Sequence, residues 1–434
     1  MSEVSPLLVG YAARDVTPAV GTRLSGFAAR TEPAVGVHDP LSARAVAFGH
    51  GRSSVVAVVV DVIGVDASLA ADVVAGVRAR SPVPPDDVVV AATHTHGGPA
   101  VLRDAFLGDV SEEARARVVA GAVEAALGAL RDLAPAELSY AVGSEPHVAR
   151  NRRVPGGPID PRVPVLLARR QGRRDVALVG YACHPVVLGP DNLLVTRDHP
   201  GFLVDALEAS LPGTDAVFLG GCSGQVNTGH SAEASLELTS TPRRSFAAAQ
   251  RVGEAVAAAA VAALEGDARA VALGPVRAAR TVALLPFVPP ATDPSEDRAR
   301  WLAELDGDPP PSPARRGWLE ACRAWADRFP RPEGGVTAVD VVCWALGDLR
   351  VAWFPGEVFV EQALELAAAV PETVVCVSNA NAAPGYVPHP SAYAAGGYEV
   401  EEAFRFYGAP GPFTPDASRR LGAAMLGLLA ELRR

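Results

Sequence analysis

The chain has 434 residues, of which 49% are hydrophobic and 20% charged, and its formal net charge is −10. All 39 residues counted as lysine or arginine are arginine, because the sequence contains no lysine. This absence excludes a P-loop nucleoside triphosphatase, a protein kinase, a pyridoxal phosphate enzyme and a metallohydrolase whose two metals share a carbamylated lysine. The acidic balance and the shortness of the arginine runs argue against nucleic-acid binding.

The first 18 residues have no basic segment followed by an apolar core, so we expect no signal peptide. The longest apolar runs, such as Val55–Val60 and Ala255–Leu264, are too short to span a bilayer. Five cysteines without CxxC spacing are typical of reduced thiols. We therefore expect a cytoplasmic protein without a transmembrane segment.

Apolar runs of strand length alternate with longer amphipathic runs along most of the chain. The expected strands are Val55–Asp61, Asp87–Ala92, Val165–Ala168, Val176–Ala182, Ala216–Leu219, Val336–Leu346, Leu349–Phe354 and Thr373–Ser378. The expected helices are Ala67–Arg80, Ser111–Leu130, Gly201–Ser210, Phe246–Glu265, Glu357–Ala369 and Ala417–Leu432. This alternation predicts an α/β fold with a mixed, largely buried sheet covered by helices.

Residues 286–335 interrupt the pattern, because they are rich in Pro, Asp, Glu and Arg. Helix-like pieces at Arg298–Leu305 and Trp318–Arg328 flank the run Asp308–Pro311. We expect a single domain over residues 1–434 with a helical excursion at about 286–335. This excursion either borders a substrate cleft or is a surface elaboration without function.

Three of the nine histidines follow predicted strands. His94 and His96 lie in the motif Thr-His-Thr-His-Gly-Gly-Pro directly after Asp87–Ala92, and His184 follows Val176–Ala182. Residues at i and i+2 of an extended chain point to the same side. Strand ends of an α/β sheet commonly share one site, and neutral imidazole with carboxylate suits Zn²⁺. The pattern therefore predicts a metal site.

Three further motifs carry polar groups after predicted strands or in loops. Gly220–His230 is a glycine-dense loop that mimics a nucleophile elbow, but Gln225 stands where G-x-S-x-G requires glycine, so we do not assign Ser223 as a catalytic serine. Glu357 follows a Pro-Gly turn and is expected at the start of a helix, where the helix dipole favours its charge. Gly385–Glu399 is a loop dense in Tyr, Gly and Pro.

Taken in order, these features resemble the catalytic domain of the neutral/alkaline (non-lysosomal) ceramidases, zinc amidases that cleave the N-acyl bond of ceramides. The resemblance begins at Gly10–Pro18, includes Asn151-Arg152 and ends in the tyrosine-rich loop and the helix after it. It spans roughly residues 8 to 432, and it implies one large zinc hydrolase domain of the neutral ceramidase type.

The resemblance also implies roles for individual residues. The zinc ligands of the family fall on His94, His184, Glu357 and Tyr386. His96 falls on a hydrogen-bonding partner beside the metal. Tyr398, twelve residues after Tyr386, falls on the tyrosine that contacts the reacting amide, and Arg152 falls on an arginine of the site.

The sequence departs from the family at two places. A serine proposed in the family as nucleophile or substrate contact is replaced by Asn227, in the stretch Gly224–Thr228. The ceramidases also carry a secretion signal and a C-terminal immunoglobulin-like domain, which this sequence does not show. These departures point away from ceramide itself as the substrate.

We therefore expect a zinc-dependent hydrolase that cleaves a C–N amide bond of a small-molecule or lipid-like substrate by zinc-activated water. His96 would move a proton to the leaving amine, while Tyr398, Arg152 and Asn227 would stabilise the oxyanion or the substrate. One alternative is zinc-dependent acyl transfer or cyclisation, which forms or cleaves a lactam or an ester in a specialised metabolite pathway. Another is a catalytically inactive binding homologue. The sequence does not fix the oligomeric state.

Overall fold

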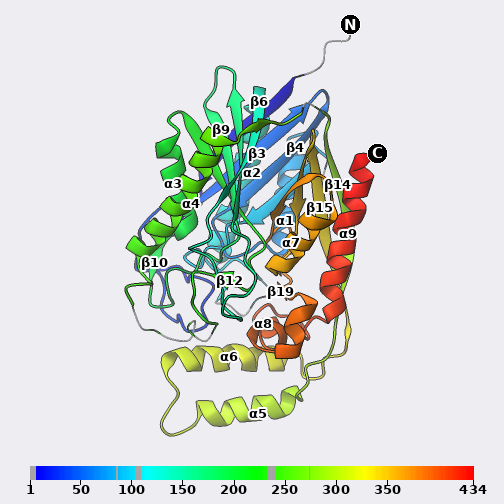
Figure 1. Ribbon diagram of the computed structural model, residues 1–434. Helices are drawn as coiled ribbons and strands as arrows, with labels where there is room; N and C mark the ends of the chain where they lie inside the picture. Colours follow the sequence, from blue (N-terminus) through cyan, green and yellow to red (C-terminus); the bar gives the residue numbers. More distant parts are fainter. Residues whose placement is uncertain are drawn as a thin grey trace.

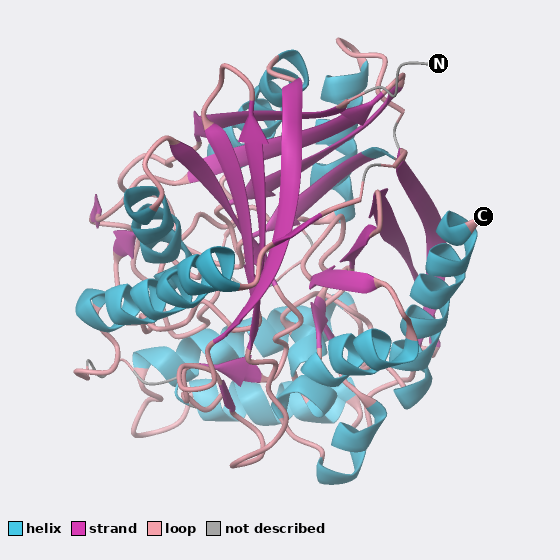
Figure 2. Ribbon diagram, turned by 45° about the horizontal axis from the view of Figure 1, so that its top comes forward, coloured by secondary structure: helices cyan, strands magenta, loops and turns pink. Residues whose placement is uncertain are grey.

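The structure is a computed structural model that describes residues 6–84, 87–103, 105, 109–232, 234, 238, 241–272 and 274–434. Two β-sheets stack face to face, and helices cover the outer face of each (Figures 1 and 2). Of the first 18 residues, for which we expect no signal peptide, the first five lie outside the described part of the chain.

The large sheet is mixed. Its main strands, in spatial order, are β11 (Thr214–Gly220), β9 (Asp175–Tyr181), β8 (Arg162–Arg170), β6 (Ala134–Ser144), β1 (Leu7–Asp15), β3 (Ser42–His50), β4 (Ser53–Val60) and β5 (Val88–Ala92), and β13 (Arg269–Ala270) pairs with β6. The pairs at the two ends, β11 with β9 and β4 with β5, are parallel, and the pairs between them are antiparallel.

The second sheet has four strands, in the order β14 (Val276–Phe287), β15 (Gly335–Leu346), β16 (Leu349–Trp353) and β18 (Thr373–Val377). Three two-stranded pairs complete the described strands: β2 (Gly36–Val37) with β10 (Leu194–Val195), β7 (Arg150–Asn151) with β12 (Val226–Asn227), and β17 (Glu357–Val358) with β19 (Tyr386–Val387). The β7–β12 and β17–β19 pairs carry predicted site residues.

Helices pack on the outer faces of both sheets. The large sheet is covered by α1 (Ala67–Arg78), α2 (Glu112–Arg131), α3 (His199–Ser210) and α4 (Phe246–Gly266), and the second sheet by α7 (Val360–Ala369) and α9 (Pro415–Arg433). By length and apolar composition alone, α4 would also pass as a membrane-crossing helix, but it packs against α3 and the large sheet.

The continuous apolar run of β4 follows from this layering. Val56, Val58 and Val60 contribute to the core under α1 and α2, whereas Val55 and Val59 contribute to the core between the two sheets. Successive side chains of a strand point to opposite faces, so a strand buried on both faces has no polar positions. The predicted α/β fold with a mixed, largely buried sheet is confirmed. Helices cover the outer face of the large sheet, and the second sheet covers its inner face.

The remaining helices lie at one end of the sheets. α5 (Pro294–Leu305) and α6 (Pro313–Arg328) form a pair at the bottom of Figure 1, next to α8 (Tyr398–Glu401) and the short 3₁₀ helices η3 (Pro390–Ala395) and η4 (Ala403–Arg405). The pair leaves the second sheet after β14 and returns at β15. It extends past the sheets to the end of the molecule where the predicted site residues gather.

One local prediction was wrong. We expected Glu357 at the start of a helix, but it lies in strand β17, and α7 begins three residues later at Val360. The register of β17 with β19 sets Glu357 opposite Tyr386. The backbone at this position is therefore fixed by a strand partner from the tyrosine-rich loop and not by a helical turn.

Candidate metal centre

The two histidine-bearing strand ends come from opposite sides of the large sheet, because β5 is its last strand and β9 its second. The segment Ser378–Asn381, which follows β18, connects β5 with β11, the neighbour of β9. The Asn381 amide donates to the carbonyl of Val90 on β5 at 2.7 Å, and the Ser378 amide donates to the carbonyl of Gly220 on β11 at 2.8 Å. The rings of His94 and His184 lie with their centroids 4.6 Å apart, so the two histidine-bearing segments meet.

Two of the predicted ligands are held by backbone carbonyls. The Nδ1 atom of His94 lies 2.5 Å from the carbonyl oxygen of Ile63, and the Nδ1 atom of His184 lies 2.7 Å from that of Ser223. A carbonyl only accepts, so each Nδ1 carries the proton. His94 reaches this position with a left-handed backbone (φ 67°), which shows that the chain has left the extended conformation at the motif.

The remaining nitrogens of this pair face one carboxylate. Glu357 Oε2 lies 2.7 Å from His184 Nε2 and 3.3 Å from His94 Nε2, and all three side chains are buried. Burial lowers the pKa of His184, so its Nε2 bears a lone pair. Three acceptor atoms therefore converge without a donor between them, which is the arrangement that a bound cation satisfies.

Tyr386 adds a fourth candidate ligand atom, its hydroxyl oxygen, next to this group. Its ring stacks on His184 with centroids 6.2 Å apart, and burial together with the charge of Glu357 raises the pKa of its hydroxyl. The hydroxyl accepts a hydrogen bond from Arg152 at 3.1 Å. Two imidazoles, a carboxylate and a phenol oxygen form a set of metal ligands that suits Zn²⁺.

His96 lies beside the pair but is held differently. One ligand atom from each of His94, His96 and His184 lies within 4.8 Å of the others. Within the described part of the chain, both ring nitrogens of His96 are buried without a hydrogen-bond partner. Burial and the neighbouring histidines lower its pKa well below the usual value. Its ring packs at 4.8 Å from Phe27, and its Nδ1 faces the backbone of Gly26.

Arg152 and Tyr398 complete the predicted set near Tyr386. Arg152 donates to Glu399 Oε1 at 2.7 Å, and Arg153 pairs with the other oxygen of the same carboxylate. The rings of Tyr398 and Tyr386 meet edge to face at 5.8 Å. Burial raises the pKa of the Tyr398 hydroxyl, so this hydroxyl remains a donor.

Asn227 is committed to its own loop. Its Oδ1 accepts from the backbone amides of Gly229 at 2.7 Å and His230 at 3.0 Å, and its Nδ2 donates to the His230 carbonyl at 2.7 Å. The second N–H of this carboxamide has no hydrogen-bond partner among the described residues. The residue is 1% exposed, and the hydrogen bonds of its side chain stabilise the turn at residues 227–230.

Several contact residues were missed from the sequence. The Tyr407 hydroxyl donates to Glu357 Oε1, and its ring meets Tyr386 edge to face at 6.0 Å. Nothing in the local sequence distinguishes Tyr407 from a packing residue. Glu399 directly follows Tyr398, and this place in the tyrosine-rich loop is the sequence signal that could have indicated it. Arg30, from a loop near the N-terminus, donates to the His96 carbonyl and was not found.

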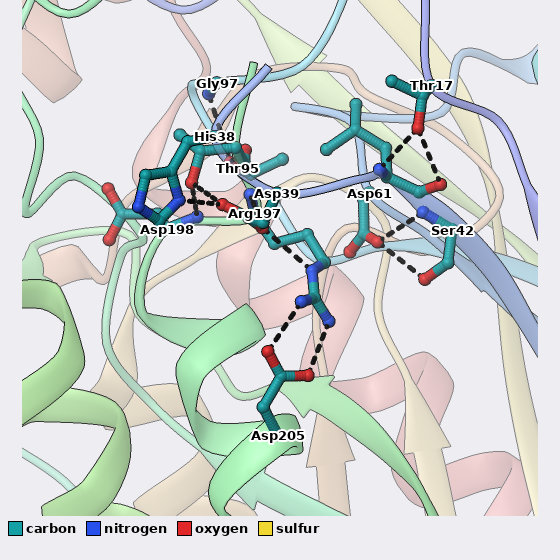
Figure 3. Close-up of polar contacts among 12 residues, drawn as sticks. Thr17, His38, Asp39, Ser42, Asp61, Thr95, Gly97, Arg197, Asp198 and Asp205 are labelled. Carbon is teal, nitrogen blue, oxygen red and sulfur yellow. Dashed lines mark hydrogen bonds and ion pairs between the residues drawn. The ribbon is translucent and has the colours of Figure 1, made fainter. Parts of the chain in front are cut away.

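A polar network supports the histidine motif from behind (Figure 3). The Thr95 hydroxyl donates to the Thr196 carbonyl at 2.8 Å. Arg197, the next residue, pairs with Asp39 at 2.9 Å and with Asp205 at 2.8 Å. These contacts tie Thr95, the residue between His94 and His96, to the segment that leads into α3.

A cavity of 330 Å³ opens beside the cluster. Its lining includes His96, Arg152, Asn227, Tyr386, Tyr398 and Tyr407, and on the side of the helical pair Arg315 and Trp318 of α6. This volume lies at the lower end of the range for small-molecule sites. The structure thus brings the predicted site residues to one place, with the predicted metal ligands at the edge of the cavity.

The sequence matches the family model described as neutral/alkaline non-lysosomal ceramidase, N-terminal, over residues 7–276. Among solved structures, neutral ceramidase from Pseudomonas aeruginosa superposes with a TM-score of 0.77 at 20% identity, covering 99% of this chain and 75% of that chain. A structure described as ceramidase complexed with C2 gives the same values. No curated protein matches the sequence. At this identity, the structural likeness shows a shared fold.

Proposed function

The chain belongs to the neutral/alkaline non-lysosomal ceramidase family, and from this membership and the site geometry we propose that it is a zinc-dependent amidohydrolase. Its substrate is an N-acyl amide of a small or lipid-like molecule. The observation that carries the proposal is the convergence of His94 Nε2, His184 Nε2 and Glu357 Oε2 without a donor between them. Tyr386 would be the fourth ligand.

Zinc bound at this position supplies a Lewis acid and a water whose pKa falls to about 7. His96 is suited to move protons in the same reaction. Because neither of its buried ring nitrogens has a hydrogen-bond partner among the described residues, one of them can accept a proton and then deliver it to the nitrogen of the departing amine.

Charge that develops on the amide oxygen is met by two donors. The Tyr398 hydroxyl keeps its proton because burial raises its pKa. Arg152 remains charged between Glu399 and Tyr386. Loss of one such donor typically costs about 100-fold or more in rate. The free N–H of Asn227 is a third, weaker contact to the substrate.

The test combines metal content with turnover. Protein purified without added metal should carry about one zinc per chain by mass spectrometry and should hydrolyse simple N-acyl amides, with a product mass equal to substrate plus water. Glu357→Gln and His94→Ala should each lose both properties, because each removes a converging acceptor. His50→Ala, on strand β3 away from the site, is the matched control.

Two results would sink the proposal. One is a double variant, His94→Ala with Glu357→Gln, that hydrolyses amides at the parental rate. The other is a zinc-loaded parental protein that cleaves no amide in a broad panel. A product whose mass equals substrate minus water would assign the site to cyclisation instead of hydrolysis.

A further inference from the structure

The cavity beside the histidines is bounded on one side by the α5–α6 pair. Arg315, Trp318 and Glu402 line this cavity, and the same three residues line a second hollow of 540 Å³. The second hollow lies between the helical pair and residues 401–412, with Trp301 and Pro412 among its lining. These three side chains therefore form the wall that separates the catalytic cavity from the outer hollow.

The indole of Trp318 is held by two neighbours. The guanidinium carbon of Arg315 lies 4.2 Å from the centre of its ring, and Arg315 itself is held by two hydrogen bonds to Glu304 of α5, at 2.7 and 2.9 Å. The ring of Trp301 meets Trp318 edge to face at 6.1 Å. A side chain packed in this way does not swing aside without losing these contacts.

Helix α6 is also placed firmly relative to the reacting groups. A Cβ atom at Gly317 would lie 2.1 Å from the Ala28 carbonyl oxygen, so the helix backbone rests directly on the loop that contacts His96. At its other end, Trp325 Nε1 donates to the Ala409 carbonyl at 2.7 Å, in the segment that follows Tyr407. Contacts at both ends of α6 therefore fix the position of the wall relative to the loop beside His96 and the segment after Tyr407.

Resting on the amidase function proposed above, we propose that Trp318 is a specificity-determining residue that closes the catalytic cavity against long alkyl chains. The part of the substrate that meets this wall is a compact group, and long-chain amides are excluded because the chain would have to enter the space that the indole fills. Removing the indole joins the 330 Å³ cavity to the 540 Å³ hollow.

The test compares chain-length profiles in two substrate series: N-acyl p-nitroanilides from acetyl to hexadecanoyl, and N-alkyl acetamides from ethyl to hexadecyl. The parental protein should show kcat/KM falling with length in at least one series. In that series, Trp318→Ala should raise the ratio of kcat/KM for the twelve-carbon substrate to kcat/KM for the two-carbon substrate by about tenfold or more. The same ratio for Trp318→Phe should lie between those of the parental protein and Trp318→Ala.

Trp344→Phe is the matched control, because Trp344 is a buried tryptophan of strand β15 that does not line the cavity. It should leave the length profile unchanged, and thermal unfolding of every variant checks that the fold is intact. If Trp318→Ala and the parental protein share one length profile in both series, the inference is overturned while the amidase function stands.

A parental protein that cleaves no member of either series would count against the proposed function, and binding then decides the inference. Calorimetric titration with hexanoate and dodecanoate should show that Trp318→Ala gains at least about tenfold affinity for dodecanoate alone. Equal affinities of the two proteins for dodecanoate would overturn the role of Trp318.

Discussion

The candidate metal centre and the wall beside α6 are built in opposite ways, although both border the same cavity. The candidate centre collects His94, His184, Glu357 and Tyr386 from four separate segments, and backbone carbonyls or strand register hold each one. Two of the three wall residues, Arg315 and Trp318, come from the continuous α5–α6 segment, whose side chains hold one another. Changes in the wall should therefore alter which substrate fits while the reacting groups stay in place.

The largest effect should follow from breaking the centre itself. In His184→Ala one of the three converging acceptors is missing, so bound metal should be lost and kcat/KM should fall by roughly 1000-fold or more. Metal analysis and amide hydrolysis measure the two consequences. His50→Ala is again the control, since His50 is the last residue of strand β3 and lies away from the ligands. Retention of full metal content in His184→Ala would contradict the ligand assignment.

A second, smaller effect should arise where the N-terminal loop touches the centre. Gly26 has a φ of 105°, and a Cβ atom there would lie 2.3 Å from His96 Nδ1. Gly26→Ala should displace His96 and lower kcat by about 100-fold, within the range typical for loss of a general acid–base group, while metal content is retained.

Gly21→Ala is the matched control for that substitution. Gly21 has a similar φ of 94°, but a Cβ atom there meets nothing within 4 Å. Both variants carry the cost of a left-handed alanine, about 1 kcal/mol, and only the first displaces His96. Equal activities of the two variants would show that the close approach of Gly26 to His96 does not matter for catalysis.

The wall should respond more mildly. Gly317→Ala pushes α6 away from the Ala28 carbonyl, so we expect a loss of about 1–2 kcal/mol in the free energy of unfolding and a raised KM with little change in kcat. Gly427→Ala in α9 is the control, because a Cβ atom there meets nothing and alanine favours a helix by up to about 1 kcal/mol. A kcat loss in Gly317→Ala as large as that of Gly26→Ala would erase the distinction between the two regions.

The same contrast explains what could be predicted from the sequence. Strands such as β4 and β5 were found because they are buried on both faces and read as continuous apolar runs. Strands β1 and β14 were missed because arginines interrupt their apolar pattern: Arg14 is exposed near the end of β1, and Arg277 and Arg280 are half-buried within β14. The extent of α7 was overestimated because the pairing of Glu357 with Tyr386 is not encoded locally.

Site residues followed a similar division. His94, His96 and His184 were predicted from their place after apolar strands, which is a local signal. The roles of Tyr386, Tyr398 and Arg152 came only from the family resemblance. Tyr407 and Arg30 touch the centre through tertiary contacts alone, and no spacing in the sequence marks them. The role of Trp318 depends on where α6 lies, so it needed the structure.

The smallest effect concerns His230, a half-buried residue of the cavity lining. Burial and the charges of Arg244 and Arg243 lower its pKa to about 4. Between pH 6.5 and 4 the unfolded chain binds a proton that the folded chain does not, so stability is complete above pH 6.5 and falls as the pH approaches 4. His230→Asn should therefore lose less stability on acidification than the parental protein, by about 1 kcal/mol after solvent screening.

Urea unfolding at pH 7 and pH 4.5 measures the difference, and His147→Asn, at an exposed position, should match the parental protein. If His230→Asn lost as much stability on acidification as the parental protein, the lowered pKa of this imidazole would not contribute to the acid sensitivity of the fold.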